Sequence, residues 1–155
     1  MASFAQLDIT NTVVKIVKIG NDVPTSNGPL GENDKHVDGE KYCNELLGGN
    51  WKQSSFSGAF RGRAAMIGGT YNPENDVFID AQPYVSWTLN ANNEWQAPVT
   101  RPTETQELYI SYTGADLNAD LYGSKWNEEQ QRWEARDINN VLNIWNPNTS
   151  SWSPA

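Results

Sequence analysis

The sequence predicts a mainly β protein with one short helix, built from antiparallel sheets and several β-hairpins that are clamped by aromatic pairs. Three observations carry this prediction. Aromatic residues flank short polar segments at a spacing that suits hairpins, β-branched runs are separated by turn-forming residues, and a single segment shows helical periodicity. Six of the seven tryptophans form three such pairs, so aromatic residues must supply much of the buried surface.

Four segments share the pattern of an aromatic residue, a polar turn and a second aromatic residue. Facing residues of an antiparallel hairpin lie equally far from the middle of the turn, so pairing the two aromatics defines each loop. The loops are then three or four residues long, which are common hairpin lengths. The predicted facing pairs are Tyr71 with Phe78, Trp87 with Trp95, Trp126 with Trp133, and Trp145 with Trp152, around loops 73–76, 90–92, 128–131 and 147–150.

The first forty residues predict a hairpin and then a long loop. Residues 4–7 and 12–19 have strand composition on either side of a turn at 8–11. The second run contains VVKIVKI and lacks a clean period of two, which is compatible with a strand covered on both faces. Residues 20–39 are rich in Gly, Asn, Asp, Pro and Ser, a composition typical of loops.

One segment after this loop predicts a short helix. Asp38 suits the N-cap position, and the pair Gly48-Gly49 can end the helix with a left-handed residue. Four apolar residues share one helical face, which predicts that this face packs on the rest of the protein. They are Tyr42, Cys43, Leu46 and Leu47.

The remaining segments alternate between strands and loops. Residues 51–54 and 108–112 predict strands, whereas 54–64, 96–106 and 113–124 predict loops or connectors. The hairpins recur at no fixed period, which argues against a solenoid or a propeller.

The order of these elements suggests three parts. An N-terminal part holds the strand pair, the long loop, the helix and a strand, and an aromatic hairpin region packs on it. The C-terminal Trp hairpins form either a separate small subdomain or an arm that contacts a partner. The parts span residues 1–66, 67–112 and 113–155.

Charge and composition argue against several partners. The formal net charge is -8 and the pI is about 4.5, whereas nucleic acids and anionic membranes attract basic surfaces. We therefore expect neither nucleic acid nor a membrane as a partner. No apolar run is long enough to span a bilayer. The first residues, MASFAQLDITN, lack the features of a secretory signal, which predicts synthesis in a cytoplasm.

Few residues are candidates for catalysis. Cys43 and His36 are the only residues of their types, and we expect the first on an apolar helix face and the second in a polar loop. Nucleophilic catalysis, an internal disulfide and a zinc site are therefore not expected. Glu128 and Glu129 lie in a predicted hairpin loop as solvated side chains, so no carboxylate pair is singled out for glycoside hydrolysis. The sequence predicts a protein without a cofactor that is not an enzyme.

The best metal candidate is an acidic loop. Asp116, Asn118 and Asp120 occupy the first, third and fifth positions of an EF-hand-like calcium loop. Leu121 stands where this loop needs Gly, and Asn127 stands where it needs a bidentate Glu. We expect a solvated acidic loop here and no bound metal.

Several motifs resemble a known group of proteins. The most specific are SWTLN at 86–90 and WQAPV at 95–99, and KWNEEQQRW at 125–133 also fits closely. In these motifs, and in FAQLD at 4–8 and YCNELLG at 42–48, the chain resembles virion structural proteins of marine bacteriophages, best known in the cyanophage group. The resemblance covers roughly two-thirds of the chain, and residues 137–155 add a further Trp hairpin beyond it.

This resemblance implies a place in a phage particle, and it brings no catalytic residues with it. The implied function is a decoration or accessory component of the capsid, neck or tail that docks on other virion proteins, with self-association as a further option. The alternative function is a carbohydrate-binding adhesin module that contacts host surface glycans through exposed tryptophans. The candidate contact residues for a partner or a glycan are Trp126, Trp133, Trp145 and Trp152.

Overall fold

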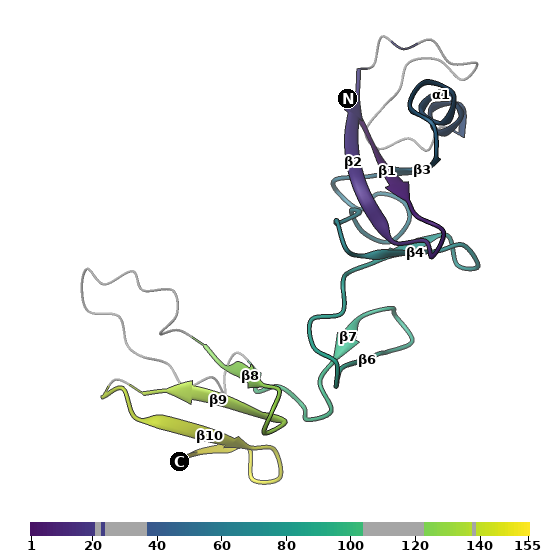
Figure 1. Ribbon diagram of the computed structural model, residues 1–155. Coiled ribbons are helices and arrows are strands. Elements are labelled where there is room, and N and C mark those ends of the chain that lie inside the picture. Colours follow the sequence, from purple (N-terminus) through teal and green to yellow (C-terminus); the bar gives the residue numbers. More distant parts are fainter. Residues whose placement is uncertain (21–22, 24–36, 104–122, 138) are drawn as a thin grey trace. The chain divides into compact units, whose positions relative to one another are not determined.

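The computed structural model describes residues 1–20, 23, 37–103, 123–137 and 139–155 (Figure 1). The fold is mainly β with one short helix and several antiparallel sheets, which confirms the predicted fold class. The chain divides into two compact units, unit 1 from Met1 to Gln82 and unit 2 from Pro83 to Ala155. The boundary between them falls inside the 67–112 segment that the sequence analysis treated as one region.

Each unit has its own set of elements. Unit 1 contains β1 (Ala2–Leu7), β2 (Val13–Ile19), α1 (Val37–Leu47), β3 (Asn50–Ser54), β4 (Thr70–Asn72) and β5 (Val77–Ile79). Unit 2 contains β6 (Thr88–Leu89), β7 (Trp95–Gln96), β8 (Lys125–Asn127), β9 (Arg132–Arg136), β10 (Leu142–Asn146) and β11 (Ser151–Pro154). The predicted strand 108–112, the loop segments around 24–36 and 116–120, and His36 lie outside the described residues.

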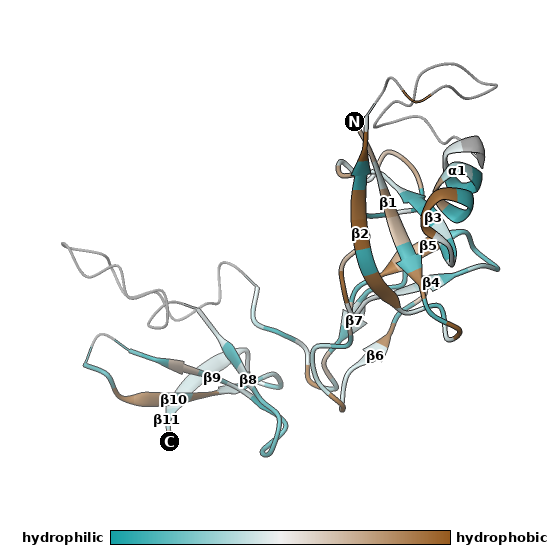
Figure 2. Ribbon diagram, turned by 45° about the horizontal axis from the view of Figure 1, so that its top comes forward, coloured by the Kyte–Doolittle hydropathy of each residue, from teal (hydrophilic) through white to brown (hydrophobic). Residues whose placement is uncertain are grey.

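Unit 1 is built on a three-stranded antiparallel sheet in the order β2-β1-β3. The central strand β1 is covered on both faces because its side chains alternate between two clusters. Ala2 and Phe4 pack with Trp51 and residues of α1, whereas Ala5 and Leu7 pack with residues of the β4–β5 hairpin. The strand predicted to be covered on both faces, β2, is instead an edge strand with exposed residues, and Figure 2 shows its alternating hydropathy.

Helix α1 lies along the outer edge of β3 and closes it with side-chain hydrogen bonds. The Asn44 side-chain oxygen accepts from Trp51 N–H at 3.0 Å, and Glu40 Oε1 accepts from Gln53 N–H at 3.0 Å. Four residues of a helix rise about 6 Å, and two residues of a strand advance about 6.6 Å. The spacing of the two acceptors therefore matches that of the two donors, and these two N–H groups of β3 are satisfied without another strand.

This attachment explains why only half of the predicted apolar face of the helix is packed in the core. Tyr42 and Cys43 pack in the core beside Trp51, but Leu46 and Leu47 are 60% and 44% exposed. The hydrogen bonds to β3 set the rotation of the helix, and they turn the buried Glu40 inward. The helix also begins at Val37, so Asp38 lies in its first turn rather than before it. Gly48 and Gly49 follow the last helical residue with positive φ, as predicted.

A buried ion network joins α1, β3 and the β4–β5 hairpin. Arg61 bonds Glu40 through Nη1, and it donates to the Gln53 carbonyl at 2.7 Å and to Asp76 Oδ1 at 2.7 Å. The Tyr71 hydroxyl donates to the same Asp76 oxygen. Burial alone would lower the pKa of Arg61, but the hydrogen bonds that Arg61 donates to Glu40 and Asp76, together with the charges of these carboxylates, outweigh burial and raise that pKa. The network therefore holds Arg61 charged inside unit 1.

Three of the four predicted hairpin registers are confirmed. Tyr71 faces Phe78, Trp126 faces Trp133, and Trp145 faces Trp152. Each pair has ring centroids 5.3 Å apart. The facing aromatics thus clamp their hairpins through tilted or edge contacts, the arrangement that aromatic rings prefer.

The predicted register of the fourth hairpin is wrong. Trp95 faces Leu89 rather than Trp87, which moves the loop one residue along the chain. The Asn90 side chain sets this turn, because its oxygen accepts from the backbone N–H groups of Asn92 and Glu94. Asn93 then adopts a positive φ of 59°. Trp87 is left to pack outside its own hairpin.

The same turn chemistry recurs at six described turns, two more than the aromatic pattern indicated. At each, an Asp or Asn side-chain oxygen accepts a backbone N–H two or three residues ahead, as in an Asx turn, and a left-handed residue closes the turn. The accepting residues are Asp8, Asn72, Asn90, Asn127, Asp137 and Asn146. The closing residues are Asn11, Asp76, Asn93, Gln131, Asn140 and Ser150, with φ between 47° and 61°.

In unit 2, the last two hairpins share one four-stranded antiparallel sheet in the order β11-β10-β9-β8 (green to yellow in Figure 1). The turn at Asp137 joins them, and β9 and β10 pair with Ile144 opposite Glu134. Trp133 and Trp145 lie one step beyond that pair. The four tryptophans therefore form a row across one face of the sheet, one from each strand, which we call the tryptophan row.

Candidate functional site

The tryptophan row contains all four residues predicted to contact a partner or a glycan. Trp126, Trp133 and Trp145 are only 6%, 4% and 5% exposed, and Trp152 is half-buried beside them. The structure brings the four residues together, but three of their rings are inside the unit. The row therefore packs mainly inside unit 2, and Trp152 is its partly exposed member.

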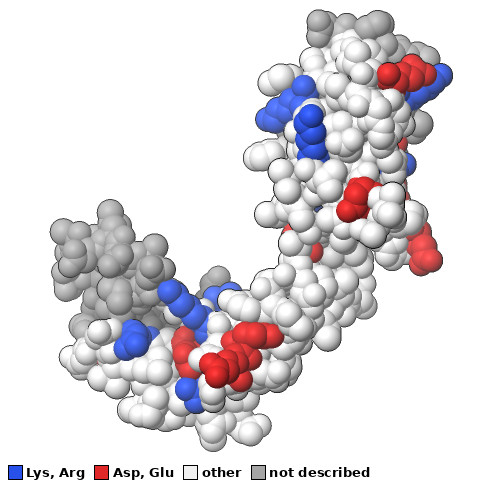
Figure 3. Space-filling view, in the orientation of Figure 1, with Lys and Arg blue, Asp and Glu red and all other residues white. Residues whose placement is uncertain are grey.

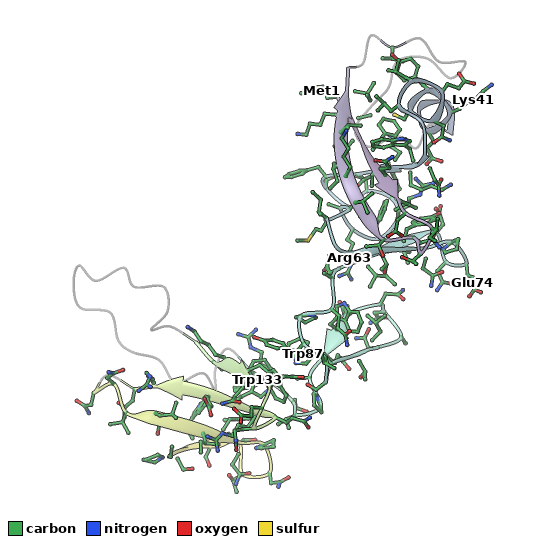
Figure 4. The ribbon with its side chains drawn as sticks, in the orientation of Figure 1. Met1, Lys41, Arg63, Glu74, Trp87 and Trp133 are labelled. Carbon is green, nitrogen blue, oxygen red and sulfur yellow. The ribbon has the colours of Figure 1, made fainter. Side chains whose placement is uncertain are left out.

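Residues 87–99 cover part of this row. The Trp87 ring meets Trp126 and Trp133 edge-on, at centroid distances of 6.3 and 5.9 Å, and Figure 4 shows Trp87 beside Trp133. The Trp133 indole N–H donates to the Val99 carbonyl at 2.8 Å. Ala97 and Val99 also pack against the row. These contacts explain why Trp87 packs on the tryptophan row and does not face Trp95 in its own hairpin.

A carboxylate of the β8–β9 loop joins the two parts of unit 2. Glu128 accepts hydrogen bonds from the Ser86 N–H at 2.8 Å and hydroxyl at 2.7 Å, and from the Trp126 indole at 2.7 Å. These bonds, led by that of the Ser86 hydroxyl, lower the pKa of Glu128 below its usual 4.5. The prediction that Glu128 is simply solvated is therefore wrong, because this side chain fixes residue 86 to the loop.

Beside the row lies a groove of about 430 Å³, which we call the indole groove. Most of its lining comes from residues 95–101, and Trp87 and Trp133 complete it. Trp95 is half-buried, whereas Gln96, Thr100 and Arg101 are exposed. The lining residues are Trp87, Trp95, Gln96, Ala97, Val99, Thr100, Arg101 and Trp133.

The electrostatic character of the indole groove comes from Arg101. Its guanidinium carbon lies 5.4 Å from the centre of the Trp133 ring, within the range of a cation–π contact. Among the described residues that line the groove it is the one charged residue. The chain as a whole carries a formal charge of -8, and Figure 3 shows its charged side chains as separate small groups on a largely uncharged surface.

A different kind of surface lies on unit 1. Val14, Met66 and Ile67 are 49%, 57% and 67% exposed. Their backbone segments adjoin, because Gly68 donates to the Val13 carbonyl at 2.9 Å and Val13 donates to Gly69 at 2.8 Å. We call these three side chains the apolar edge patch, since they lie at the start of edge strand β2.

The described residues contain little that suits covalent or metal chemistry. Cys43 is fully buried, and burial raises the pKa of its thiol to about 11, so it remains protonated at neutral pH. No group of three or more potential metal ligands occurs in the part of the chain that the structure describes. Within the same residues, no helix is long and apolar enough to cross a membrane. The candidate calcium ligands at 116–120 lie outside them.

Comparisons with known proteins add no functional assignment. No protein-family model matches the chain, no curated protein matches it, and no solved structure matches its fold. Its function must therefore be argued from its own residues.

Sequence reasoning missed the indole groove and the apolar edge patch. The aromatic spacing predicts that Trp95 faces Trp87, and this wrong register hides the position of Trp95 in the lining of the groove. Arg101 carried one available signal, since a lone cation follows the WQAPV motif in an acidic chain. Met66 and Ile67 fall at a predicted domain boundary, and their exposure depends on tertiary contacts that no local pattern reveals.

Proposed function

We propose that this protein is a non-enzymatic structural component of a bacteriophage particle, a decoration or accessory protein that acts by docking on other virion proteins such as capsid or tail subunits. The apolar edge patch is the observation that carries the docking part of this proposal. Covering exposed apolar side chains with a partner lowers the free energy, because it removes apolar surface from water, so exposed apolar patches are typical of interaction sites. The virion part rests on the motif resemblance.

The arrangement of unit 1 supports docking at this edge rather than elsewhere on the sheet. The opposite edge, β3, is closed by Glu40 and Asn44 of the helix. On the outer edge of β2, the backbone hydrogen bonds within the described residues lie at the start of the strand, between Val13 and the segment Gly68-Gly69. A partner that reaches the apolar edge patch would thus also meet an edge strand, whose backbone groups favour further pairing.

Binding to phage particles from which the protein has been removed tests the proposal. We expect the purified chain to bind them, and Ile67→Asp to reduce the affinity at least about tenfold, because a charge would then enter an apolar contact. Val141→Asp is the matched control, since Val141 is an exposed apolar residue of unit 2 with 44% exposure. The proposal fails if the wild-type chain binds no virion component, or if both variants bind as well as the wild type.

A further inference from the structure

The pairing of the unit 1 sheet defines which backbone groups of β1 point towards edge strand β2 (Figure 1). The N–H groups of Trp51 and Gln53 in β3 bond side chains of α1, so they point away from β1. Facing residues of an antiparallel ladder either bond each other or both point away. Gln6 and Phe4, which face these two residues, therefore direct their backbone groups towards β2.

Two residues of β2 present backbone groups on the outer side of the sheet. Gln6 and Phe4 face Lys15 and Val17, so these two use their backbone groups inside the sheet. Ile16 and Lys18 alternate with them and point their N–H and C=O groups outwards. No described segment bonds these outward groups. They offer donors and acceptors at the spacing that an added strand requires.

The same edge carries two exposed lysines. Lys15 and Lys18 are three positions apart, so their side chains lie on opposite faces of the sheet. Lys18 Nζ lies 6.0 Å from the centre of the Phe56 ring, which is 75% exposed. No ion pair joins either lysine to a carboxylate of the described residues. Both charges are therefore available to a partner.

These charges select the kind of strand that can be added. Two copies of β2 that pair edge to edge would bring four lysines together, and lysines on edge strands are a common means of preventing such pairing. A strand with carboxylates opposite the lysines is attracted instead, because cross-strand pairs of opposite charge stabilise a sheet. The structure therefore favours an acidic partner over a second copy.

The lysines also define a sequence pattern for this partner. In an antiparallel strand, the first and fourth of four successive residues face Lys18 and Lys15, and the middle two face Val17 and Ile16. Both of these β2 residues pack partly on core clusters, so apolar residues opposite them extend the apolar layers. The pattern is acidic, apolar, apolar, acidic.

We infer that β2 receives an extended segment of the docking partner with this pattern, which we call the acidic strand. Its backbone bonds Ile16 and Lys18, and its carboxylates pair with the two lysines. It lies next to the apolar edge patch, since Val14 belongs to both β2 and that patch. The inference rests on the proposed docking function and adds the chemistry of the partner.

Binding of two labelled peptides to the full chain, measured by fluorescence anisotropy, tests the inference. The acidic peptide contains Glu-Val-Ile-Glu between threonines, and the basic peptide has lysine in place of each glutamate. We expect the acidic peptide to bind at least about tenfold more tightly, because the facing charges attract in one peptide and repel in the other. The inference is overturned if the chain binds neither peptide or binds both equally.

Charge reversal makes the test specific to β2. Lys15→Glu combined with Lys18→Glu should reverse the preference, so that the basic peptide binds at least about tenfold more tightly. Lys41→Glu is the matched control, because it reverses an exposed lysine of α1, the helix that closes the opposite edge of the sheet. This control should keep the preference of the wild type. A double variant that still prefers the acidic peptide overturns the inference.

Blocked peptide groups separate strand addition from a simple charge contact. The first glutamate and the isoleucine face Lys18 and Ile16, so their N–H groups point towards β2. N-methylation of these two residues should weaken binding at least about tenfold, whereas N-methylation of the valine and the second glutamate should change it little. Equal losses in both peptides contradict strand addition.

The docking proposal and the acidic strand fail in different experiments. If the wild type and the Lys15/Lys18 double variant bind phage particles equally well while Ile67→Asp binds poorly, docking stands and the acidic strand is overturned. If the chain prefers the acidic peptide but binds no virion component, docking fails, and the peptide preference still supports an acidic strand on β2.

Discussion

Units 1 and 2 use the same turn chemistry but build their interiors in different ways. Unit 1 covers a three-stranded sheet with a helix and a hairpin, and it buries the Glu40–Arg61 ion pair with side chains 7% and 4% exposed. Unit 2 has no helix among its described residues and is held by a row of indoles. One of the seven tryptophans, Trp51, is in unit 1, and six are in unit 2.

The comparison shows two ways to build a protein interior with few aliphatic residues. A helix can close a sheet edge and bring its own polar groups inside, which then require partners. Indoles bury a large area each and need only one hydrogen bond for the ring N–H. Unit 1 therefore depends on a polar network, whereas unit 2 depends on ring contacts.

The two interiors can be followed separately in the full chain. Labelling of the buried Cys43 thiol reports opening of unit 1, because Cys43 is the sole cysteine. Tryptophan fluorescence reports mainly unit 2. Urea titrations with both probes give one midpoint for each unit.

The largest expected effect is on the tryptophan row. Trp133→Ala removes a 4% exposed ring that contacts two other indoles, and such losses cost about 3–5 kcal/mol. We expect the fluorescence midpoint to fall sharply while the Cys43 labelling midpoint stays unchanged. Trp152→Ala, at the half-buried end of the row, should cost less. Equal shifts of both midpoints would show that the two units unfold as one.

The second effect concerns the buried charges of unit 1. Glu40→Gln leaves Arg61 with one carboxylate partner fewer inside the protein, which should cost about 3 kcal/mol. The Cys43 labelling midpoint should fall, and the fluorescence midpoint should change little. Glu45→Gln is the matched control because it breaks the exposed Lys41–Glu45 pair, worth about 0.5 kcal/mol or less. Similar losses in both variants would contradict a special role for the network.

A smaller effect, this time a gain in stability, is expected from a substitution in one of the turns. Gln131 closes the β8–β9 turn at a φ of 47°, a conformation that costs a residue with a Cβ about 1 kcal/mol. Gln131→Gly should therefore raise the fluorescence midpoint of unit 2. Glu129→Gly changes the same loop at a residue without positive φ and should lower it through chain entropy. A gain in both variants would mean that the loop is not strained at Gln131.

The smallest effects are those of pH, and they differ in sign between Cys43 and Tyr71 of unit 1 and Glu128 of unit 2. In unit 1, burial raises the pKa of Cys43 from 9.0 to about 11, and burial with the Asp76 hydrogen bond raises the pKa of Tyr71 from 10.0 to about 12. Both groups therefore stay protonated to higher pH in the folded state than in the unfolded state. Their contribution to stability is complete below about pH 9 and is lost as the pH rises towards about 12.

In unit 2, the lowered pKa of Glu128 has the reverse consequence. The contribution of its hydrogen bonds is present above its usual 4.5 and is lost as the pH falls through the lowered value. Acid should therefore change the tryptophan fluorescence, and alkali should expose Cys43. Glu128→Gln should remove the acid step of unit 2. An acid step that persists in this variant would assign it to another group.

Local chemistry was sufficient for the hairpins whose aromatic pairs belong to the same turn. Tyr71 and Phe78 face each other because Asn72 starts the turn and Asp76 closes it, and all four residues are close in sequence. The same holds for the pairs of β8–β9 and β10–β11. The register at Trp87 failed because two signals competed, and the Asn90 turn outweighed the aromatic spacing.

The amino-acid sequence by itself determined the mainly β class, the short helix, most of the strands and three hairpin registers, because these follow from turn residues and side-chain alternation within a few positions. The tertiary structure decided which surfaces are hidden. Leu46 and Leu47 are exposed since Glu40 and Asn44 bind β3, and Trp126, Trp133 and Trp145 are buried since hairpins join into one sheet under residues 87–99. Burial depends on contacts between distant segments, and no local pattern carries that information.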